Sequence, residues 1–127
     1  MKVLNISNHT LTKQQIQMIN EFYNIDANIV ELPNDIKDSI GNLPPLCQER
    51  QKIVDKIIDF IINNNIRFAH IDGEAHFVYK LIVEIKLRQL DVRLFKFYSE
   101  RSVIEKKLSD GSIQTVRTFK PVYILEY

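Results

Sequence analysis

The stretch IRFAHIDGEAHFVYKLIVEI, residues 66–85, decides the fold class of this chain. A β-favouring apolar run from Ile66 to Ile71 ends in a turn at Asp72-Gly73-Glu74. Beyond the turn, apolar residues recur at helical spacing: Phe77, Val78, Leu81, Ile82 and Ile85. A strand, a tight turn and an amphipathic helix in this order predict one strand–helix unit of an α/β protein.

The same alternation continues on both sides of this unit. Further strands are predicted at residues 2–6, 28–32 and 92–98, and helices after Thr12, over 35–40 and over 46–63. Near the end, Asp110-Gly111 between residues 102–108 and 112–119 is a hairpin signal, and Pro121 is expected to interrupt the edge. We therefore expect one Rossmann-like α/β domain over residues 1–127. Its sheet should be mainly parallel and flanked by helices, with a C-terminal β-hairpin.

Composition narrows the functional classes. A net charge of +1, from 17 basic and 16 acidic residues, argues against a binder of long nucleic acid, so any phosphate site must be a local patch. No apolar run approaches the ~18 residues of a membrane span. Cys47 is the only cysteine, which favours a reducing, cytoplasmic location. His70 and His76 have no metal-ligand spacing with each other or with Cys47, so we expect no metal and no cofactor.

Polar segments follow three of the predicted strands. They are Ser7-Asn8-His9, Asp72-Gly73-Glu74 and Tyr98-Ser99-Glu100-Arg101. Open parallel sheets bind ligands in the crevice beyond the carboxyl ends of their strands, so these segments predict a ligand site. The alternative interpretation is that each is an ordinary polar loop.

Three residues in these segments suggest particular roles. His9 can exchange a proton near neutral pH, or it is a solvated loop histidine. Gly73 allows a tight turn or the close approach of a ligand to the backbone. Glu74 suits the positive end of the following helix dipole, which is a structural role, or it binds a ligand hydroxyl.

The hairpin predicts a pair of cations. A two-residue turn at Asp110-Gly111 without a bulge pairs Ser109 with Ser112, and the same register pairs Arg101 with Lys120. Like charges directly opposite each other cost stability, so a bound anion explains such a pair better than folding does. Two alternatives remain: the side chains splay apart into solvent, or a bulge moves the pair out of register.

Several of these segments together resemble a known family. The opening strand with Ser7-Asn8-His9-Thr10-Leu11-Thr12 resembles the start of small stand-alone CRISPR-associated ring nucleases of type III systems. Residues 98–105, followed by 110–112 and Phe119-Lys120, are similar to their C-terminal signature. In that signature a Thr/Ser-x-Arg turn leads into an acidic hairpin and a final Phe-Lys/Arg-His segment. Pro121 stands where the last histidine often occurs.

The resemblance implies a Rossmann-like fold related to CARF domains and a homodimer with its site at the subunit interface. The implied ligand is a cyclic oligoadenylate, most often the tetra-adenylate, which such enzymes cleave to switch off antiviral signalling. The chemistry needs no metal, because each ribose 2′-hydroxyl can attack the adjacent phosphodiester in line. The protein has to hold that geometry and stabilise the developing charge.

On this hypothesis His9, Arg101 and Lys120 are the catalytic residues. The expected ligand-binding residues are Ser7, Asn8, Gly73, Glu74, Tyr98 and Ser99. Two other functions stay open. One is a protein of the same fold that sequesters the ring without cutting it, and the other is a regulatory adaptor with no nucleotide ligand.

Overall fold

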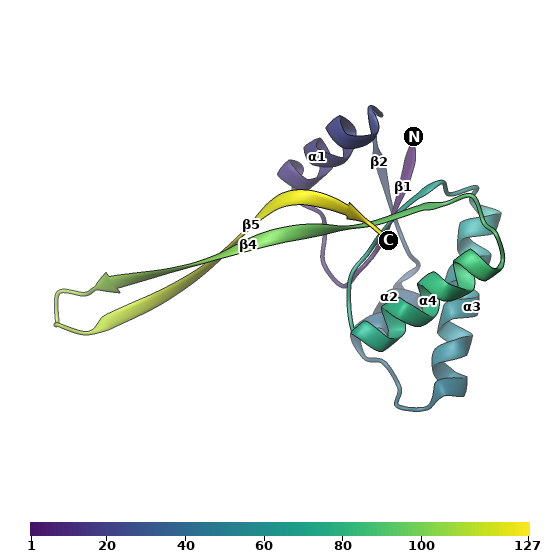
Figure 1. Ribbon diagram of the computed structural model, residues 1–127. Helices are drawn as coiled ribbons and strands as arrows, with labels where there is room; N and C mark the ends of the chain where they lie inside the picture. The colour runs from purple at the N-terminus through teal and green to yellow at the C-terminus, as the bar shows by residue number, and fades with distance from the viewer.

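A five-stranded sheet forms the centre of the protein in the computed structural model, which describes residues 1–127 (Figure 1). The strands are β1 (Lys2–Ile6), β2 (Asn28–Glu31), β3 (Phe68–Ile71), β4 (Arg93–Lys107) and β5 (Ile113–Glu126). They lie in the order β2-β1-β3-β4-β5, in which the first four are parallel and β5 runs antiparallel to β4. The predicted fold class, a mainly parallel sheet with a C-terminal hairpin, is confirmed.

Helices cover both faces of the sheet. They are α1 (Lys13–Tyr23), α2 (Asn34–Gly41), α3 (Cys47–Asn63) and α4 (Ala75–Leu87). An apolar cluster of 18 buried residues joins one face to α2, α3 and α4, and a cluster of six joins the other face to α1. A strand buried on both faces must be apolar on both sides. In β1, accordingly, Val3 packs in the smaller cluster and Leu4 in the larger.

The strand order reverses between β1 and β3. From β1 the chain passes to β2 on one side, and it later returns to β3 on the other side. Open α/β sheets bind ligands at such a reversal, beyond the carboxyl ends of the strands. The segments that follow the two strands meet there, since the amide of Asp72 donates to the carbonyl of Ile6 at 3.1 Å.

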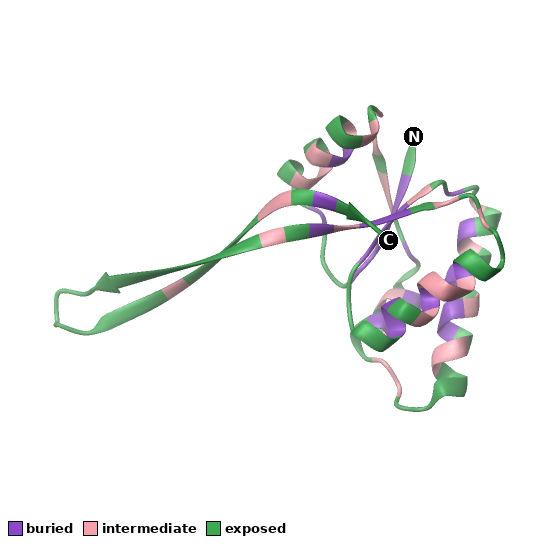
Figure 2. Cartoon of the chain, in the orientation of Figure 1, coloured by how far each residue is buried: buried purple, intermediate pink, exposed green.

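Strands β4 and β5 continue far beyond the rest of the sheet (Figure 1). Only Arg93–Phe95 of β4 pair with β3, and the later residues pair with β5 alone. We call residues 99–121 the arm, and Figure 2 shows that it is almost entirely exposed. The prediction that β4 ends at Tyr98, with Ser99-Glu100-Arg101 as a strand-end turn, is therefore wrong. Pairing with β5 satisfies the backbone of β4 as far as Lys107.

The turn at the tip of the arm shifts the register by one residue. The amide of Leu108 donates to the carbonyl of Ser112 at 2.8 Å, and the amide of Gly111 donates to the carbonyl of Leu108 at 3.0 Å. The loop therefore holds three residues, 109–111, rather than two. Gly111 has a φ of 88°, as expected for the last position of a three-residue hairpin loop.

This shift separates the predicted pair of cations. Arg101 lies opposite Phe119, with its guanidinium carbon 5.5 Å from the centre of the ring, whereas Lys120 lies opposite Glu100. Successive residues of a strand point to opposite faces, so Arg101 and Lys120 point away from each other. The prediction that they pair is wrong, because the glycine-ended loop adds one residue to the turn.

Pro121 does not interrupt β5. Tyr98 pairs with Tyr123 and Ser99 with Pro121, which leaves Val122 as an extra residue in a bulge. Proline has no amide to donate to a ladder, and bulges on edge strands are among the few places where a sheet accepts it. The arm therefore begins directly at a bulge.

Candidate functional site

A cavity of about 190 Å³, which we call the crevice, opens beyond the carboxyl ends of β1 and β3. It is lined by residues after β1, at the end of α2 and after β3: Asn8, His9, Ile40, Gly41, Asp72 and Gly73. The structure thus brings together three predicted site residues, Asn8, His9 and Gly73. The end of α2 lies so close that a Cβ on Gly41 would be 3.0 Å from Oδ1 of Asn8.

Ser7 lies beneath the crevice rather than in it. The side chain is buried, and its hydroxyl lies 2.8 Å from Oδ1 of Asn5 and 3.0 Å from the carbonyl of His9. The same oxygen accepts a hydrogen bond from the amide of His9 at 3.3 Å. The amide group of Asn5 also donates to the carbonyl of His9 at 2.7 Å. Ser7 and Asn5 therefore fix the backbone that presents His9.

Asn5 belongs to a polar row across the centre of the sheet. Glu31, Asn5 and His70 are in register on β2, β1 and β3. The amide nitrogen of Asn5 lies 3.3 Å from both carboxylate oxygens of Glu31, and its Oδ1 lies 3.0 Å from Nδ1 of His70. Lys37 completes the row with an ion pair to Glu31 at 3.2 Å. Every buried side-chain polar atom in the protein has a partner, so no buried polar atom of this row is left unpaired.

His70 is the one titratable side chain in this row that is buried. Burial lowers its pKa from 6.5 to about 4, so the ring is neutral at physiological pH. Oδ1 of Asn5 can only accept, so Nδ1 of His70 carries the proton. The ring also packs against Phe95 and Phe97, with centroids 5.7 Å and 5.1 Å away. His70 thus supports the crevice without reaching it.

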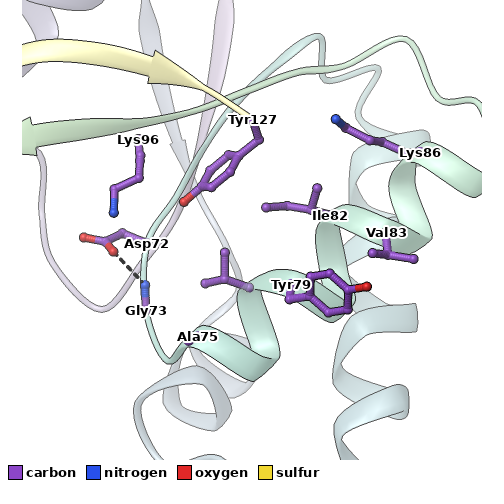
Figure 3. A pocket seen from close by; sticks show the side chains of 10 residues that line it. Asp72, Gly73, Ala75, Tyr79, Ile82, Val83, Lys86, Lys96 and Tyr127 are labelled. Carbon is purple, nitrogen blue, oxygen red and sulfur yellow. Dashed lines mark hydrogen bonds between the residues drawn. The ribbon is translucent and has the colours of Figure 1, made fainter.

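Glu74 has a structural role at the start of α4. Its carboxylate caps the helix by accepting from the amide of His76 at 2.8 Å, and it forms an ion pair with Arg50. The hydrogen bond from Arg50 holds the pKa of Glu74 below its usual value. A carboxylate thus occupies the positive end of α4, and the amide of Gly73 donates to Oδ1 of Asp72 at 2.9 Å (Figure 3), which leaves the loop after β1 as the polar backbone of the crevice.

A larger cavity of about 540 Å³ adjoins the crevice and shares Asp72 and Gly73 with it. It runs along α4, with apolar residues of that helix on one side and Lys96 and Tyr127 on the other (Figure 3). The hydroxyl of Tyr127 donates to the carbonyl of Ile71 at 2.9 Å, and burial raises its pKa to about 12. We call this cavity the side pocket.

Sequence reasoning missed Lys96 and Tyr127. The available signal for Lys96 was a lone charge within the apolar run Leu94–Phe97. Tyr127 gave no local signal, because its position depends on β5 returning beside β4.

The other predicted site residues lie at or beyond the start of the arm. Tyr98 is half-exposed and faces Tyr123, and Ser99 follows it at the bulge. Arg101 lies six residues beyond Phe95, the last residue of β4 paired with β3, which is about 20 Å along the strand. Neither Arg101 nor Lys120 lines the crevice of its own chain.

The structure holds no group of three or more histidine, cysteine, aspartate or glutamate side chains placed to bind a metal ion. None of its four helices is both long and apolar enough to cross a membrane.

The strand order, the helices on both faces and the crevice at the reversal define a Rossmann-like α/β protein with a cavity at the position where open α/β sheets bind ligands. The chain belongs to the family described as "Uncharacterized protein MJ1673 family", whose model matches residues 1–123. That match includes both the crevice and the arm. No curated protein and no solved structure gives a significant match to the chain.

Proposed function

We propose that the protein is a metal-independent ring nuclease that binds cyclic tetra-adenylate and cleaves it, switching off type III CRISPR antiviral signalling. The observation that carries the proposal is the crevice at the strand reversal, where His9 and Asn8 stand beside Gly73. This is where sheets of this class bind nucleotides. The resemblance of residues 7–12 and 98–105 to ring nucleases supplies the ligand class.

The two adjoining cavities suit the parts of a nucleotide. The crevice is small and polar, with Asn8 and His9 as hydrogen-bonding groups for a phosphate and the carboxylate of Asp72 as an acceptor for a ribose hydroxyl. The side pocket has an apolar wall and two tyrosines, Tyr79 and Tyr127, which fit a planar base. Its volume lies within the roughly 300–1,000 Å³ that is usual for small-ligand sites. Lys96 adds a positive charge to the side pocket but is not part of the crevice lining.

Cleavage proceeds by attack of a ribose 2′-oxygen on the adjacent phosphorus. The new bond to phosphorus forms as the bond to the 5′-oxygen breaks, giving a 2′,3′-cyclic phosphate and a 5′-hydroxyl. One proton leaves the 2′-hydroxyl and one reaches the 5′-oxygen, and His9 handles one of these transfers. Holding the reacting atoms in line contributes roughly 7–11 kcal/mol in well-oriented systems.

A homodimer with its site at the subunit interface belongs to the same proposal, because a two-fold symmetric ring suits a two-fold symmetric protein.

One observation favours a second function, binding without cleavage. In a single chain His9 is the only histidine of the crevice, and the crevice lining includes no cation to stabilise charge on the phosphorus.

Single-turnover incubation of the purified protein with labelled cyclic tetra-adenylate in EDTA tests the proposal. We expect a linear product ending in a 2′,3′-cyclic phosphate. His9→Ala should slow cleavage more than it weakens binding, while Arg101→Ala should damage both. His76→Ala is the matched control, since this exposed histidine lies outside both cavities.

Three results would contradict parts of the proposal. If the ring stays intact and tightly bound, the result would favour a protein that sequesters the ring without cutting it. If the protein binds no cyclic oligoadenylate, the result would favour the regulatory adaptor without a nucleotide ligand. Equal cleavage by the wild type and His9→Ala would remove His9 from the mechanism.

A further inference from the structure

The arm exposes apolar side chains that a stable monomer would cover. Val103, Ile113 and Phe119 are 60%, 65% and 63% exposed, and Ile104 on the opposite face is 49% exposed. Beyond Ser99 the two strands pair only with each other. An isolated two-stranded hairpin is at best marginally stable in water, so the arm requires a surface to pack on.

The amount of exposed surface matches a dimer. The chain exposes 8450 Å², whereas a compact monomer of its mass should expose about 7,000 Å². The excess is roughly 1,400 Å² per chain. A standard interface buries about 800 Å² per partner, and obligate homodimers bury more. Covering the excess on each of two chains therefore gives an interface of the size that permanent dimers use.

The body of the same chain also leaves apolar side chains of α4 and β5 uncovered. Leu87 on α4 and Tyr123 and Leu125 on β5 are 73%, 62% and 47% exposed. The arm points away from α4 and cannot cover it within one chain (Figure 1). In a two-fold pair, each arm can cover the body of the other chain, and the arrangement closes without leaving a free surface.

Charge also favours a second copy. The arm has five basic and three acidic residues and so carries +2, which leaves −1 on the rest of a chain with 17 basic and 16 acidic residues. None of the five arm cations forms an ion pair within the chain, whereas Lys37 and Arg50 near the crevice are both paired. The five are Arg101, Lys106, Lys107, Arg117 and Lys120. The arm is therefore the more basic part of the chain, and its cations are available to pair with carboxylates of a second copy.

The direction of the arm decides where the partner lies. Strand β4 runs parallel to β1 and β3, so the arm leaves the body at the edge where the crevice opens. A second chain held by the arm thus faces the crevice, and its own arm reaches back toward the first chain.

We propose that the arm clasps a second copy of this chain and places Arg101 beside the crevice of that copy, completing its site in trans. The packing of the arm on a second chain, which we call the clasp, is argued from the exposed surfaces alone. The role of Arg101 rests on the proposed ring-nuclease function. Arg101, which is about 20 Å along the arm from the body sheet in its own chain, then supplies the positive charge that the crevice lacks.

Sedimentation equilibrium of the full chain tests the clasp without any nucleotide. We expect a dimer for the wild type and at least a tenfold weaker dimer for Phe119→Asp. Ile62→Asp is the matched control, because Ile62 is a similarly exposed apolar residue in the last turn of α3, lines neither the crevice nor the side pocket, and should leave the dimer intact. A monomeric wild type, or a Phe119→Asp chain that dimerises as the wild type does, would overturn the clasp.

Mixing two inactive variants tests the contribution in trans. Consider a dimer of one His9→Ala chain and one Arg101→Ala chain. If the arm acts on its own chain, neither crevice has both residues. If the arm acts on the other chain, the crevice of the Arg101→Ala chain has its own His9 and receives Arg101 from the His9→Ala chain. Equal mixing should then restore about a quarter of the wild-type cleavage sites. Cleavage no greater than that of the separate variants would overturn the assignment. A dimeric wild type that does not cleave the ring would refute the proposed function, and with it the role of Arg101, while leaving the clasp established.

Discussion

Replacing His70 should flatten the pH dependence of folding stability below pH 7. In the folded protein, burial lowers the pKa of His70 from 6.5 to about 4, so the unfolded chain takes up a proton between these values and the folded chain does not. Protonation therefore favours the unfolded state, and stability falls as pH falls from about 6.5 to about 4. The slope approaches about 1.4 kcal/mol per pH unit, and the total loss is about 3 kcal/mol.

His70→Asn removes the titration while its side-chain amide can still donate to Asn5. The variant loses ring contacts with Phe95 and Phe97, so it should be less stable than the wild type at pH 7. Urea unfolding followed by circular dichroism at pH 7, 6, 5 and 4 should show the difference between the two proteins shrinking by about 3 kcal/mol. Carboxylates titrate in both proteins and cancel in the difference. A difference that stays constant from pH 7 to pH 4 would refute the reasoning.

Two further substitutions test the crevice and the tip of the arm. Ser7→Ala should destabilise the protein by about 1–2 kcal/mol in urea unfolding, since the buried hydroxyl bonds to Oδ1 of Asn5 and accepts from the amide of His9. Ser99→Ala, at a partly exposed serine, is its control, and equal effects would contradict the role of Ser7. Gly111→Ala should speed hydrogen exchange at the Leu108 amide about fivefold, because a φ of 88° costs alanine about 1 kcal/mol. Unchanged exchange would show that the loop does not depend on this glycine.

Local sequence patterns were sufficient for most of the elements and for half of the crevice lining. Thr12 and Gln15 form the capping box that their spacing predicts at the start of α1. The turn after Ile71 and the loop after Ile6 meet in the crevice, because parallel strands bring their carboxyl ends to one edge. Asn8, His9 and Gly73 were therefore within reach of sequence reasoning.

The remaining features depend on pairings that no local pattern encodes. A two-residue and a three-residue loop share the signal Asp110-Gly111, and only the bond between Leu108 and Ser112 distinguishes them. The row from Glu31 through Asn5 to His70 requires the sheet order, since these residues are 26 and 65 positions apart in sequence. Tyr127 reaches the side pocket only because β5 folds back on β4.

The arm, which contributes no residue to either apolar cluster, also constrains how its length can change. Deleting one residue from each strand between the bulge and the tip would shorten the arm by about 3.3 Å and turn every later side chain to the other face. Deleting two from each strand would shorten it by about 7 Å and keep each face as it was. In relatives, insertions and deletions in the arm should therefore add or remove two residues in each strand at a time. An alignment of the family can show whether they do.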